Sequence, residues 1–485
     1  MKLLSKATLS SLPATVTIPD YNLDDVQVSI LHFGVGNFHR AHQAVYADNL
    51  LRAGNKNSGI IGVSLRSANI RDELIQQNYL YTVATLGAPT EYRVIGAIRN
   101  ILVAPENPQQ VIAQIANENI SLITTTITEK AYYLKSGNVD TSCDALEFDL
   151  KHSSSPQTVY GFIAAGIVER YKLSGSPITI LCCDNINKGG EKLREGVSYL
   201  LKTSAPFAYQ WMLQHVSFIS SMVDRITPAT STKIRIDTMK ALTVKDTSPV
   251  PAERYLQWVI EDKFISPVPK FSEVGAILVN DVTEYETVKL RFLNAAHSIL
   301  ATIGYLFGDE YIHETMQRKE VKQLTEYMLR EELASITNAP KGIDLPAYID
   351  ETLTRFAQAK IPYKVLQVGS DTSLKIQQRW FPAIDLLLEK KQSSTKFAFI
   401  LAAWVVFIEL TIKNNTMIDP AKEKFIALNH SSNQMHITNM LTVANANNFN
   451  FFLNTDFIKR VTTFYDEMRQ SPVLNLIIKL NQQAV

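Results

Sequence analysis

Residues 28–51 read VSILHFGVGNFHRAHQAVYADNLL, and this stretch decides the fold expected for the first part of the chain. Its apolar start predicts a buried strand over Val28–Phe33, and its two glycines predict a tight turn. The apolar periodicity that follows predicts a helix from about Phe38 to Leu51. A second apolar run, Gly59–Ser64, predicts another strand. Together they form a β-α-β unit of about 30 residues, the size of a nucleotide-binding unit.

The rest of the chain falls into two parts. Strands are also predicted at Leu80–Thr85, Tyr92–Ile95, Leu122–Thr126 and Ile178–Cys183, with helices between several of them. From about Glu284 onward long helical periods dominate. The predicted helices span residues 284–306, 310–335, 346–359, 383–391, 396–413, 420–428 and 456–470. We therefore predict an α/β protein, with a doubly wound sheet domain over residues 1–282 and a mostly helical domain over residues 283–485.

The composition sets limits on partners and compartment. A net charge of +1 over 485 residues gives no indication of nucleic acid or an anionic membrane surface. The three cysteines form no framework of pairs, which suits a reducing compartment. The N-terminal segment has no apolar core long enough for a signal peptide. The most apolar run, Phe397–Ile408, has twelve residues and predicts a buried helix, because it is too short to span a bilayer. We expect a cytoplasmic protein.

The glycine turn is the first candidate site. Gly34 and Gly36 match two of the three glycines of the dinucleotide fingerprint, and His39 takes the third position. A tight turn without a ligand is the alternative. The second strand ends in SLRSAN, which lacks the carboxylate that grips ribose hydroxyls. Arg66 could instead meet a 2′-phosphate or be solvated, so these residues leave the choice between NAD and NADP open. The candidate cofactor-binding residues are Phe33, Gly34, Val35, Gly36, Asn37, Phe38 and Arg66.

A second candidate site lies in EYETVKLRFLNAAHSIL, residues 284–300. At 100° per residue, four polar side chains of this segment fall within roughly 140° of a helix. They are Glu286, Lys289, Asn294 and His297. A carboxylate, an amine, an amide and an imidazole on one face are the groups that move a proton on and off an oxygen. A half-exposed helix with its charges in water is the alternative.

Polar residues also follow three apolar runs. These pairs are Asp184–Asn185, Asp224–Arg225 and Glu129–Lys130. In open α/β sheets, ligands bind at the carboxyl ends of strands, so all three are candidates. The alternatives are a loop start for the first pair, an ion pair at a turn for the second and a charged strand end for the third.

Six motifs carry a family resemblance. They are GVGNFHRAHQA, TITEKAY, CDN, MVDRITP, WVIEDKF and KLRFLNAAHS. In this order they resemble the polyol-specific long-chain dehydrogenase/reductase family, also called the mannitol dehydrogenase family, over nearly the whole chain. The resemblance implies a Rossmann-type dinucleotide-binding domain with an N-terminal arm (1–282) and a helical substrate-binding and catalytic domain (283–485). It also implies an active site between the domains, no metal and a monomeric protein.

The resemblance assigns roles to the candidate residues. Lys289 would be the general base and acid, and Asn185 and Asn294 would donate to the substrate oxygen. His297 would orient the reacting group. Asp224 and Lys375 would contact substrate, and Glu286 and Glu129 would pass protons to bulk water. The sequence departs from the family pattern after Lys375, where Gln377 and Gln378 replace a proline and often a lysine.

The implied reaction is hydride transfer between a nicotinamide cofactor, NAD with NADP possible, and a polyol/ketose pair, with D-mannitol and D-fructose as the expected pair. Reductases of fructuronate or tagaturonate and arabinitol dehydrogenases of the same family remain alternatives. A non-catalytic nucleotide-binding sensor is the alternative of another class. A free lysine has a pKa of about 10.4, so Lys289 would need burial or cationic neighbours to act as a base.

Overall fold

The computed structural model describes residues 1–135, 137–428 and 432–482. The chain divides into two compact units, Met1–Thr283 and Glu284–Val485. The sequence placed this division one residue earlier, after residue 282. Each unit is described by itself.

The first unit is built on an eight-stranded sheet with the order β14-β13-β11-β10-β7-β2-β3-β6. The strands are β2 (Val28–Phe33), β3 (Gly59–Ser64), β6 (Ile98–Val103), β7 (Leu122–Thr125), β10 (Ile178–Cys182), β11 (Val216–Asp224), β13 (Gln257–Glu261) and β14 (Ile277–Val279). The six strands from β6 to β11 are parallel, and β13 joins β11 antiparallel. This is the strand order of a Rossmann sheet, and it reverses between β2 and β7.

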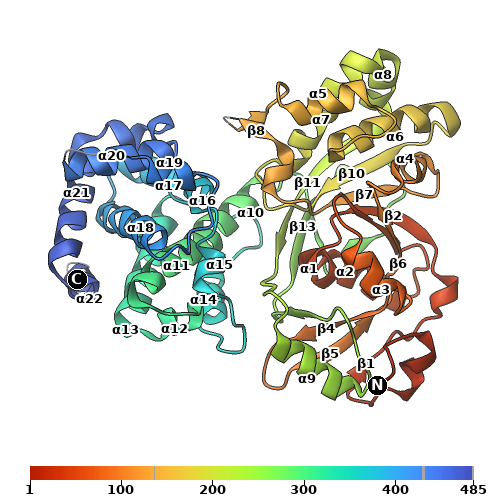
Figure 1. The fold of residues 1–485 in the computed structure, drawn as a ribbon, viewed down its shortest axis with the longest axis horizontal. Coiled ribbons are helices and arrows are strands. Elements are labelled where there is room, and N and C mark those ends of the chain that lie inside the picture. Colours follow the sequence, from red (N-terminus) through yellow and green to blue (C-terminus); the bar gives the residue numbers. More distant parts are fainter. Residues whose placement is uncertain (136, 429–431, 483–485) are drawn as a thin grey trace. The chain divides into compact units, whose positions relative to one another are not determined.

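Helices cover both faces of this sheet (Figure 1). One face packs on α1 (Asn37–Ala41), α2 (Gln43–Arg52) and α3 (Asn69–Ile75), and the other on α4 (Pro108–Ala116), α6 (Val159–Leu173) and α7 (Gly189–Ser204). Successive residues of one strand point to opposite faces, so Leu122 belongs to the hydrophobic core on one side of the sheet and Ile123 to the core on the other side. Burial on both faces explains why the parallel strands are apolar throughout.

A second sheet of the first unit has the order β1-β5-β4-β12. Its strands are β1 (Val16–Thr17), β5 (Glu91–Ile95), β4 (Tyr81–Thr85) and β12 (Val250–Ala252). The strands predicted near residues 80–85 and 92–95 are therefore present, but outside the main sheet. The short connection between them makes β4 and β5 an antiparallel hairpin, and β1 and β12 pair with its outer edges.

The helix after the glycine turn is broken, whereas the sequence predicted one continuous helix. His42 separates α1 from α2, with φ −123° and ψ −89°. Its buried Nε2 lies 2.9 Å from the main-chain oxygen of Gln257, and its ring packs between Phe38 and Tyr46. These side-chain contacts hold the main chain out of the helical conformation.

The second unit is helical. Its elements are α10 (Thr283–Val288), η5 (Lys289–Asn294), α11 (Ala295–Phe307), α12 (Ile312–Gln317), α13 (Lys319–Tyr327), η6 (Met328–Leu333), α14 (Leu345–Phe356), α15 (Val365–Val368), α16 (Thr372–Arg379), α17 (Phe381–Glu389), α18 (Thr395–Lys413), α19 (Lys422–Ile426), α20 (Asn433–Val443), η7 (Ala446–Asn448), η8 (Asn450–Leu453), α21 (Thr455–Gln470) and α22 (Val473–Gln482). The helices predicted at 284–306 and 310–335 are both interrupted, and η5 and η6 are π-helical turns.

Helix α18 forms the centre of this unit and packs on α11 and α21. It has 19 residues, longer than the apolar run that predicted it, and by length and composition it could cross a membrane. However, 72% of its most apolar window is buried inside the protein, as expected of a core helix.

Candidate functional site

The candidate residues of the first unit come together at one edge of the main sheet. A row of paired residues, Val63, Phe33, Thr125, Cys182 and Ser220, crosses strands β3, β2, β7, β10 and β11. Each candidate follows, within a few positions in the sequence, the residue that its strand contributes to this row. These candidates are Arg66, Gly34, Gly36, Glu129, Asn185 and Asp224. The topology therefore places them at the carboxyl edge, where Rossmann sheets bind ligands.

Gly34 and Gly36 differ in what the absence of a side chain permits. Gly34 has a φ of +98°, and a Cβ there would lie 2.1 Å from the main-chain oxygen of Thr126. Only glycine lets the ends of β2 and β7 approach this closely. At Gly36, the N-cap of α1, a Cβ would meet no atom within 4 Å. The main-chain N–H groups of the first turn of α1 therefore border open space, which suits the approach of a pyrophosphate.

His32 joins the two strand ends at the point where the strand order reverses. Its Nε2 lies 3.0 Å from the main-chain oxygen of Gly34 and 2.9 Å from Thr126 Oγ1, and its Nδ1 lies 2.7 Å from Thr124 Oγ1. Because a carbonyl oxygen only accepts, Nε2 carries the hydrogen and Nδ1 accepts from Thr124. Burial lowers the pKa of His32 to about 3, so the ring stays neutral. The sequence reasoning missed this residue, although a histidine inside an apolar strand, two positions before Gly34, was a visible signal.

His39 explains the missing third glycine. Its ring is fully buried and stacks on His32, with ring centroids 3.3 Å apart and planes 13° apart. Burial, with the nearby His32 and Arg40, lowers the pKa of His39 well below its ordinary range. Position 39 therefore packs beneath the turn and supports His32.

Asn37, the first residue of α1, is fixed by a buried arginine. Its Oδ1 accepts a hydrogen bond of 2.6 Å from Nη2 of Arg40, whose Nη1 donates to the main-chain oxygen of Ser248 at 2.7 Å. Tyr81 donates in turn to the main-chain oxygen of Arg40 at 2.7 Å. The second sheet thus holds the candidate cofactor turn in place.

The adjacent residues Asp184 and Asn185 point in opposite directions. Asn185 is exposed, whereas Asp184 is buried and accepts hydrogen bonds from four oxygen and nitrogen donors, with Cys182 Sγ also 3.9 Å away. The donors are Oγ1 of Thr125 (2.8 Å), Oη of Tyr132 (2.7 Å) and the main-chain nitrogens of Ile127 (2.6 Å) and Thr128 (3.0 Å). Burial raises the pKa of Asp184, and these hydrogen bonds act against the rise. Asp184 therefore fixes the loop that carries Glu129.

The remaining candidates of the first unit differ in exposure. Arg66 is exposed beyond β3, where the sheet would hold a ribose-binding residue. Asp224 ends β11 and is 1% exposed. The guanidinium of Arg225 donates to the main-chain oxygens of Glu253 and Ala41.

In the second unit, the chain from Thr283 to Phe307 is one helix with a π turn inside it. The π turn begins at Lys289 and ends at Asn294. All four candidates of this helix are buried, with Lys289 9% exposed and Asn294 6% exposed. π turns are rare and are found most often at functional sites.

The π turn narrows the sector around the helix axis over which the four polar side chains are spread. It contains one residue more than an α-helical turn, so the residues after it are rotated back by about 100° relative to those before it. Asn294 and His297 thereby move toward Glu286 and Lys289. The four side chains, expected within roughly 140° of an uninterrupted helix, then fall within roughly 80°.

Two side chains hold the end of this turn. Arg379 Nη1 donates to the main-chain oxygen of Asn294 (3.1 Å) and to Ser298 Oγ (2.9 Å). Trp380, which is fully buried, donates from Nε1 to the main-chain oxygen of Ala295 at 3.2 Å. The Asn294 side chain is therefore presented by a main chain that α16 and the start of α17 fix.

His297 lies against Phe356 and Tyr363, with ring centroids 4.4 and 5.1 Å away. Burial lowers the pKa of His297 well below its ordinary range, and four cations lower it further. They are Arg379, Arg355, Lys375 and Lys289. The imidazole is neutral and can both donate and accept a hydrogen bond.

Lys375 lies on α16 and donates to the main-chain oxygen of Val368 at 3.0 Å. Gln377 bonds its own helix, with Nε2 donating to the main-chain oxygen of Ser373, and Gln378 is exposed. Within the described residues, no group of three or more His, Cys, Asp or Glu side chains could hold a metal ion.

Two family profiles match the chain. The Mannitol dehydrogenase Rossmann domain matches residues 28–273, and the Mannitol dehydrogenase C-terminal domain matches residues 281–469. The chain belongs to the mannitol dehydrogenase family. As a member of this family it is an oxidoreductase, with a Rossmann-type domain followed by a helical domain.

Individual members of the family are similar over most of their length. The polyol:NADP oxidoreductase of Gluconobacter oxydans is 33% identical over 412 residues, which cover 83% of this chain and 84% of the relative. The mannitol 2-dehydrogenase of Pyricularia oryzae is 34% identical over 408 residues, 81% of each chain. The structure of Pseudomonas fluorescens mannitol 2-dehydrogenase in a ternary complex with NAD and D-mannitol superposes with a TM-score of 0.91 at 32% identity, covering 99% of this chain and 100% of that one.

Proposed function

We propose that this mannitol dehydrogenase family member interconverts D-mannitol and D-fructose with NAD, using Lys289 as the general base and acid. The observation that carries the proposal is the π turn, which gathers Lys289, Asn294 and a neutral His297 on one buried face. The similarity to mannitol 2-dehydrogenases supports the choice of substrate.

The residues divide the work of proton transfer. Lys289 takes the proton of the hydroxyl group on oxidation and returns it on reduction. A base must be uncharged when it acts, and burial disfavours the charged form of an amine. Lys289 is 9% exposed. Asn294 and Asn185 donate to the oxygen on which negative charge develops, and they add no charge of their own.

The other candidates have supporting roles. His297 orients the reacting group as a neutral donor and acceptor, and Asp224 and Lys375 bind the hydroxyl groups farther along the substrate. Glu286 and Glu129 pass the proton onward to water. Asp184 is added to this set as a positioning residue, since its four hydrogen bonds fix the loop of Glu129.

The glycine turn fits a nicotinamide dinucleotide. The close approach at Gly34 and the open space over Gly36 provide a place for its pyrophosphate beside the first turn of α1. The bound nicotinamide would accept or supply the hydride. Phe33, Val35, Asn37 and Phe38 line the same turn. We propose NAD because the similar Pseudomonas fluorescens mannitol 2-dehydrogenase is in complex with NAD, and exposed Arg66 makes NADP the competing cofactor.

One observation favours a second substrate class. The cations around His297 would also suit a substrate carboxylate, as in fructuronate or tagaturonate. Arg355 is 4% exposed, and a buried guanidinium is an effective partner for a carboxylate. A uronate reductase is therefore the second candidate function.

A substrate panel tests the proposal. Oxidation of NADH and of NADPH is followed at equal concentrations with fructose, fructuronate, tagaturonate, xylulose and ribulose. We expect the highest kcat/KM with fructose and NADH. A higher kcat/KM with either uronate would replace the first candidate by the second, and one with xylulose or ribulose would indicate an arabinitol dehydrogenase. NADH binding with no turnover on any substrate would indicate a nucleotide sensor and reject the proposal.

A further inference from the structure

A basic cavity of about 250 Å³ lies in the first unit. It is open to solvent and is lined by α2, the second sheet and the segments that follow β11 and β12. Its lining residues include three arginines, Arg93, Arg225 and Arg254, which come from three separate segments. None of the candidate residues of the cofactor turn lines it.

The second sheet supplies one wall of this basic cavity. Arg93 pairs with Val83 and with Thr17, and Glu91 pairs with Thr85, so these side chains lie on the same face of neighbouring strands. Helix α2 supplies the opposite wall through Val45 and Asn49, one helical turn apart.

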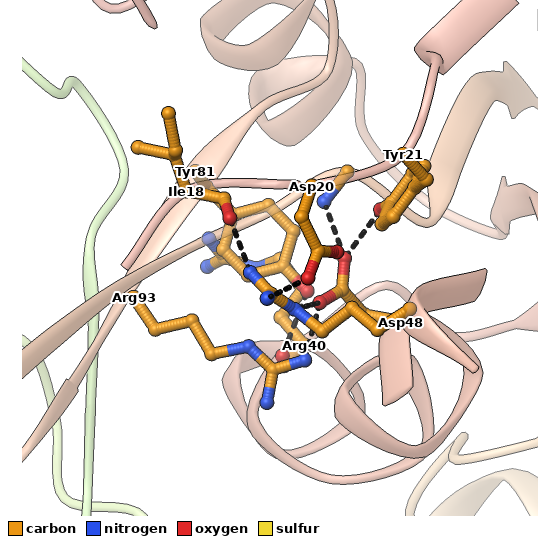
Figure 2. Close-up of polar contacts among 9 residues, drawn as sticks. Ile18, Asp20, Tyr21, Arg40, Asp48, Tyr81 and Arg93 are labelled. Atoms are coloured by element: carbon orange, nitrogen blue, oxygen red, sulfur yellow. Dashed lines mark hydrogen bonds and ion pairs between the residues drawn. The ribbon is translucent and has the colours of Figure 1, made fainter. Parts of the chain in front are cut away.

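Arg93 is held in place by polar contacts with a neighbouring carboxylate (Figure 2). Its guanidinium donates from Nη2 to Asp48, a fully buried carboxylate. Asp48 also accepts from Tyr21 Oη, from the main-chain nitrogen of Gly96 and from Arg52. Arg52 also pairs with Asp20 at 3.1 Å, so Asp48 fixes the position of Arg93 as part of a larger polar network.

Arg225 is held in place by the main chain. Nε donates to the oxygen of Glu253 at 2.9 Å and Nη1 donates to the oxygen of Ala41, and the residue is 8% exposed. The Glu253 carboxylate is buried and accepts from the main-chain nitrogen of Ile226. Neither Asp48 nor Glu253 lines the basic cavity. The positive groups therefore face it, while the buried carboxylates lie behind them.

At the rim, Arg254 pairs with Glu91 through a contact of 2.6 Å, and both side chains are more than half exposed. An ion pair this exposed contributes little, so Arg254 can turn to a bound anion at small cost. Glu91 is the one carboxylate among the described residues that line the basic cavity.

We propose that this basic cavity binds a small dianionic oxyanion, either a phosphate group or a short dicarboxylate, between Arg93, Arg225 and Arg254. Guanidinium groups bind the paired oxygens of both groups through two parallel hydrogen bonds. The lining presents three guanidinium groups and one carboxylate, Glu91, while the carboxylates of Asp48 and Glu253 lie behind Arg93 and Arg225. Hydrogen-bond donors therefore outnumber charged acceptors at the surface of the cavity, which favours an oxyanion. The volume equals that of about eight water molecules, enough for a phosphate or a four-carbon diacid.

Calorimetric titration of the full-length protein tests the proposal, with saturating NADH present so that phosphate does not occupy the cofactor turn. Inorganic phosphate and succinate are titrated separately, and the tighter one identifies the source of the oxyanion. Arg254→Gln removes the cation at the rim. Arg225→Lys keeps the positive charge but removes the paired N–H donors of the guanidinium group. We expect each variant to weaken binding by about tenfold or more.

Arg71→Gln is the matched control, because Arg71 is an ion-paired arginine of the same unit that does not line the basic cavity. It should bind within twofold of the unaltered protein. Thermal unfolding identifies a variant that has lost its fold, and Arg254→Gln alone decides the question if Arg225→Lys unfolds. The proposal is wrong if neither anion saturates the protein, or if Arg254→Gln binds as tightly as Arg71→Gln.

Discussion

The two units gather their polar residues in different ways. In the first unit, sheet topology brings Gly34, Glu129, Asn185 and Asp224 from four strands to one edge. In the second unit, a single π turn places Lys289 and Asn294 on one face of one helix. A function distributed over many strand ends should change gradually when one residue is altered. A function concentrated in one turn should be lost almost completely.

The second unit also offers an internal comparison, since it contains two π turns. The turn η6 buries Glu332, which is 3% exposed and lies close to Lys396 at the start of α18. The ammonium of Lys396 in turn lies 3.5 Å from the ring centroid of Tyr327. The same local geometry thus holds a set of complementary polar groups in η5 and a buried acid beside one base in η6.

The largest effect is expected for Lys289→Ala. Loss of a general base typically reduces turnover by about 10² to 10⁴, and we expect the upper end because the same amine also acts as the acid. Lys289→Arg should be equally inactive, since a guanidinium stays protonated. Turnover is measured as the steady-state kcat with fructose and NADH, and NADH binding is measured by fluorescence.

The exposed Lys322 of α13 provides the control for this experiment. Lys322→Ala should keep full turnover, and all three variants should bind NADH as the unaltered protein does. Turnover above about a tenth of normal in Lys289→Ala would exclude Lys289 as the base. It would also show that the function of the second unit is not concentrated in its π turn.

The next largest effect is expected for Asn294→Ala. Removal of one donor to a developing oxyanion costs about 10²-fold in kcat. The π turn should persist, because Arg379 binds the main-chain oxygen of residue 294 and not its side chain. Asn475→Ala, at an exposed position of α22, should have no effect. If the two variants have the same kcat, Asn294 does not act on the substrate oxygen.

A smaller effect, on stability, is expected for Glu332→Gln in η6. Burial raises the pKa of Glu332 to about 8, although Lys396 acts in the opposite direction. The folded protein therefore keeps this proton above pH 4.5, where the unfolded chain releases it. The stability that the protonated group contributes is complete below about pH 4.5 and is lost as the pH rises toward 8.

The loss is at most about 1.4 kcal/mol per pH unit, so the shift from 4.5 to about 8 sets an upper limit of about 5 kcal/mol over this range. Urea unfolding at pH 5, 6, 7 and 8 should show a flatter pH dependence for Glu332→Gln than for the unaltered protein. Glu331→Gln, which alters the exposed neighbour in the same turn, should leave the dependence unchanged. Equal slopes in the two variants would show that η6 holds no titrating acid.

The sequence predicted those parts of the fold that repeat a simple period. The strands Val28–Phe33 and Gly59–Ser64 were predicted with their observed bounds, because both are apolar runs that end in small or polar residues. The second sheet was not foreseen. Alternation of apolar residues identifies a strand but not its partner, and the partner of β4 is decided by the short connection to β5.

The candidate site was predictable as a set of residues and not as an arrangement. Lys289, Asn294 and His297 could be selected because amines, amides and imidazoles are unusual on a buried helix. The π turn could not, since nothing in KLRFLN breaks an α-helix. The main-chain carbonyls at its end are held by Arg379 and Trp380, more than 80 residues away in sequence. The broken helix at His42 has a similar cause, a hydrogen bond with Gln257.

The smallest effect on turnover is expected in the first unit, where the comparison predicts a gradual response. His32→Ala removes the hydrogen bonds that join Gly34 to Thr126 and Thr124, and also removes the stacking partner of His39. One net hydrogen bond is worth about 1 kcal/mol, so the Kd and KM for NADH should rise five- to tenfold. The kcat should change less than threefold.

His32→Asn can still donate to the Gly34 oxygen and should recover part of the affinity, which a general loss of packing would not allow. His152→Ala, at an exposed histidine, should match the unaltered protein. A fall in kcat as large as that of Asn294→Ala would show that the first unit is no more tolerant than the second, and the contrast between them would not hold.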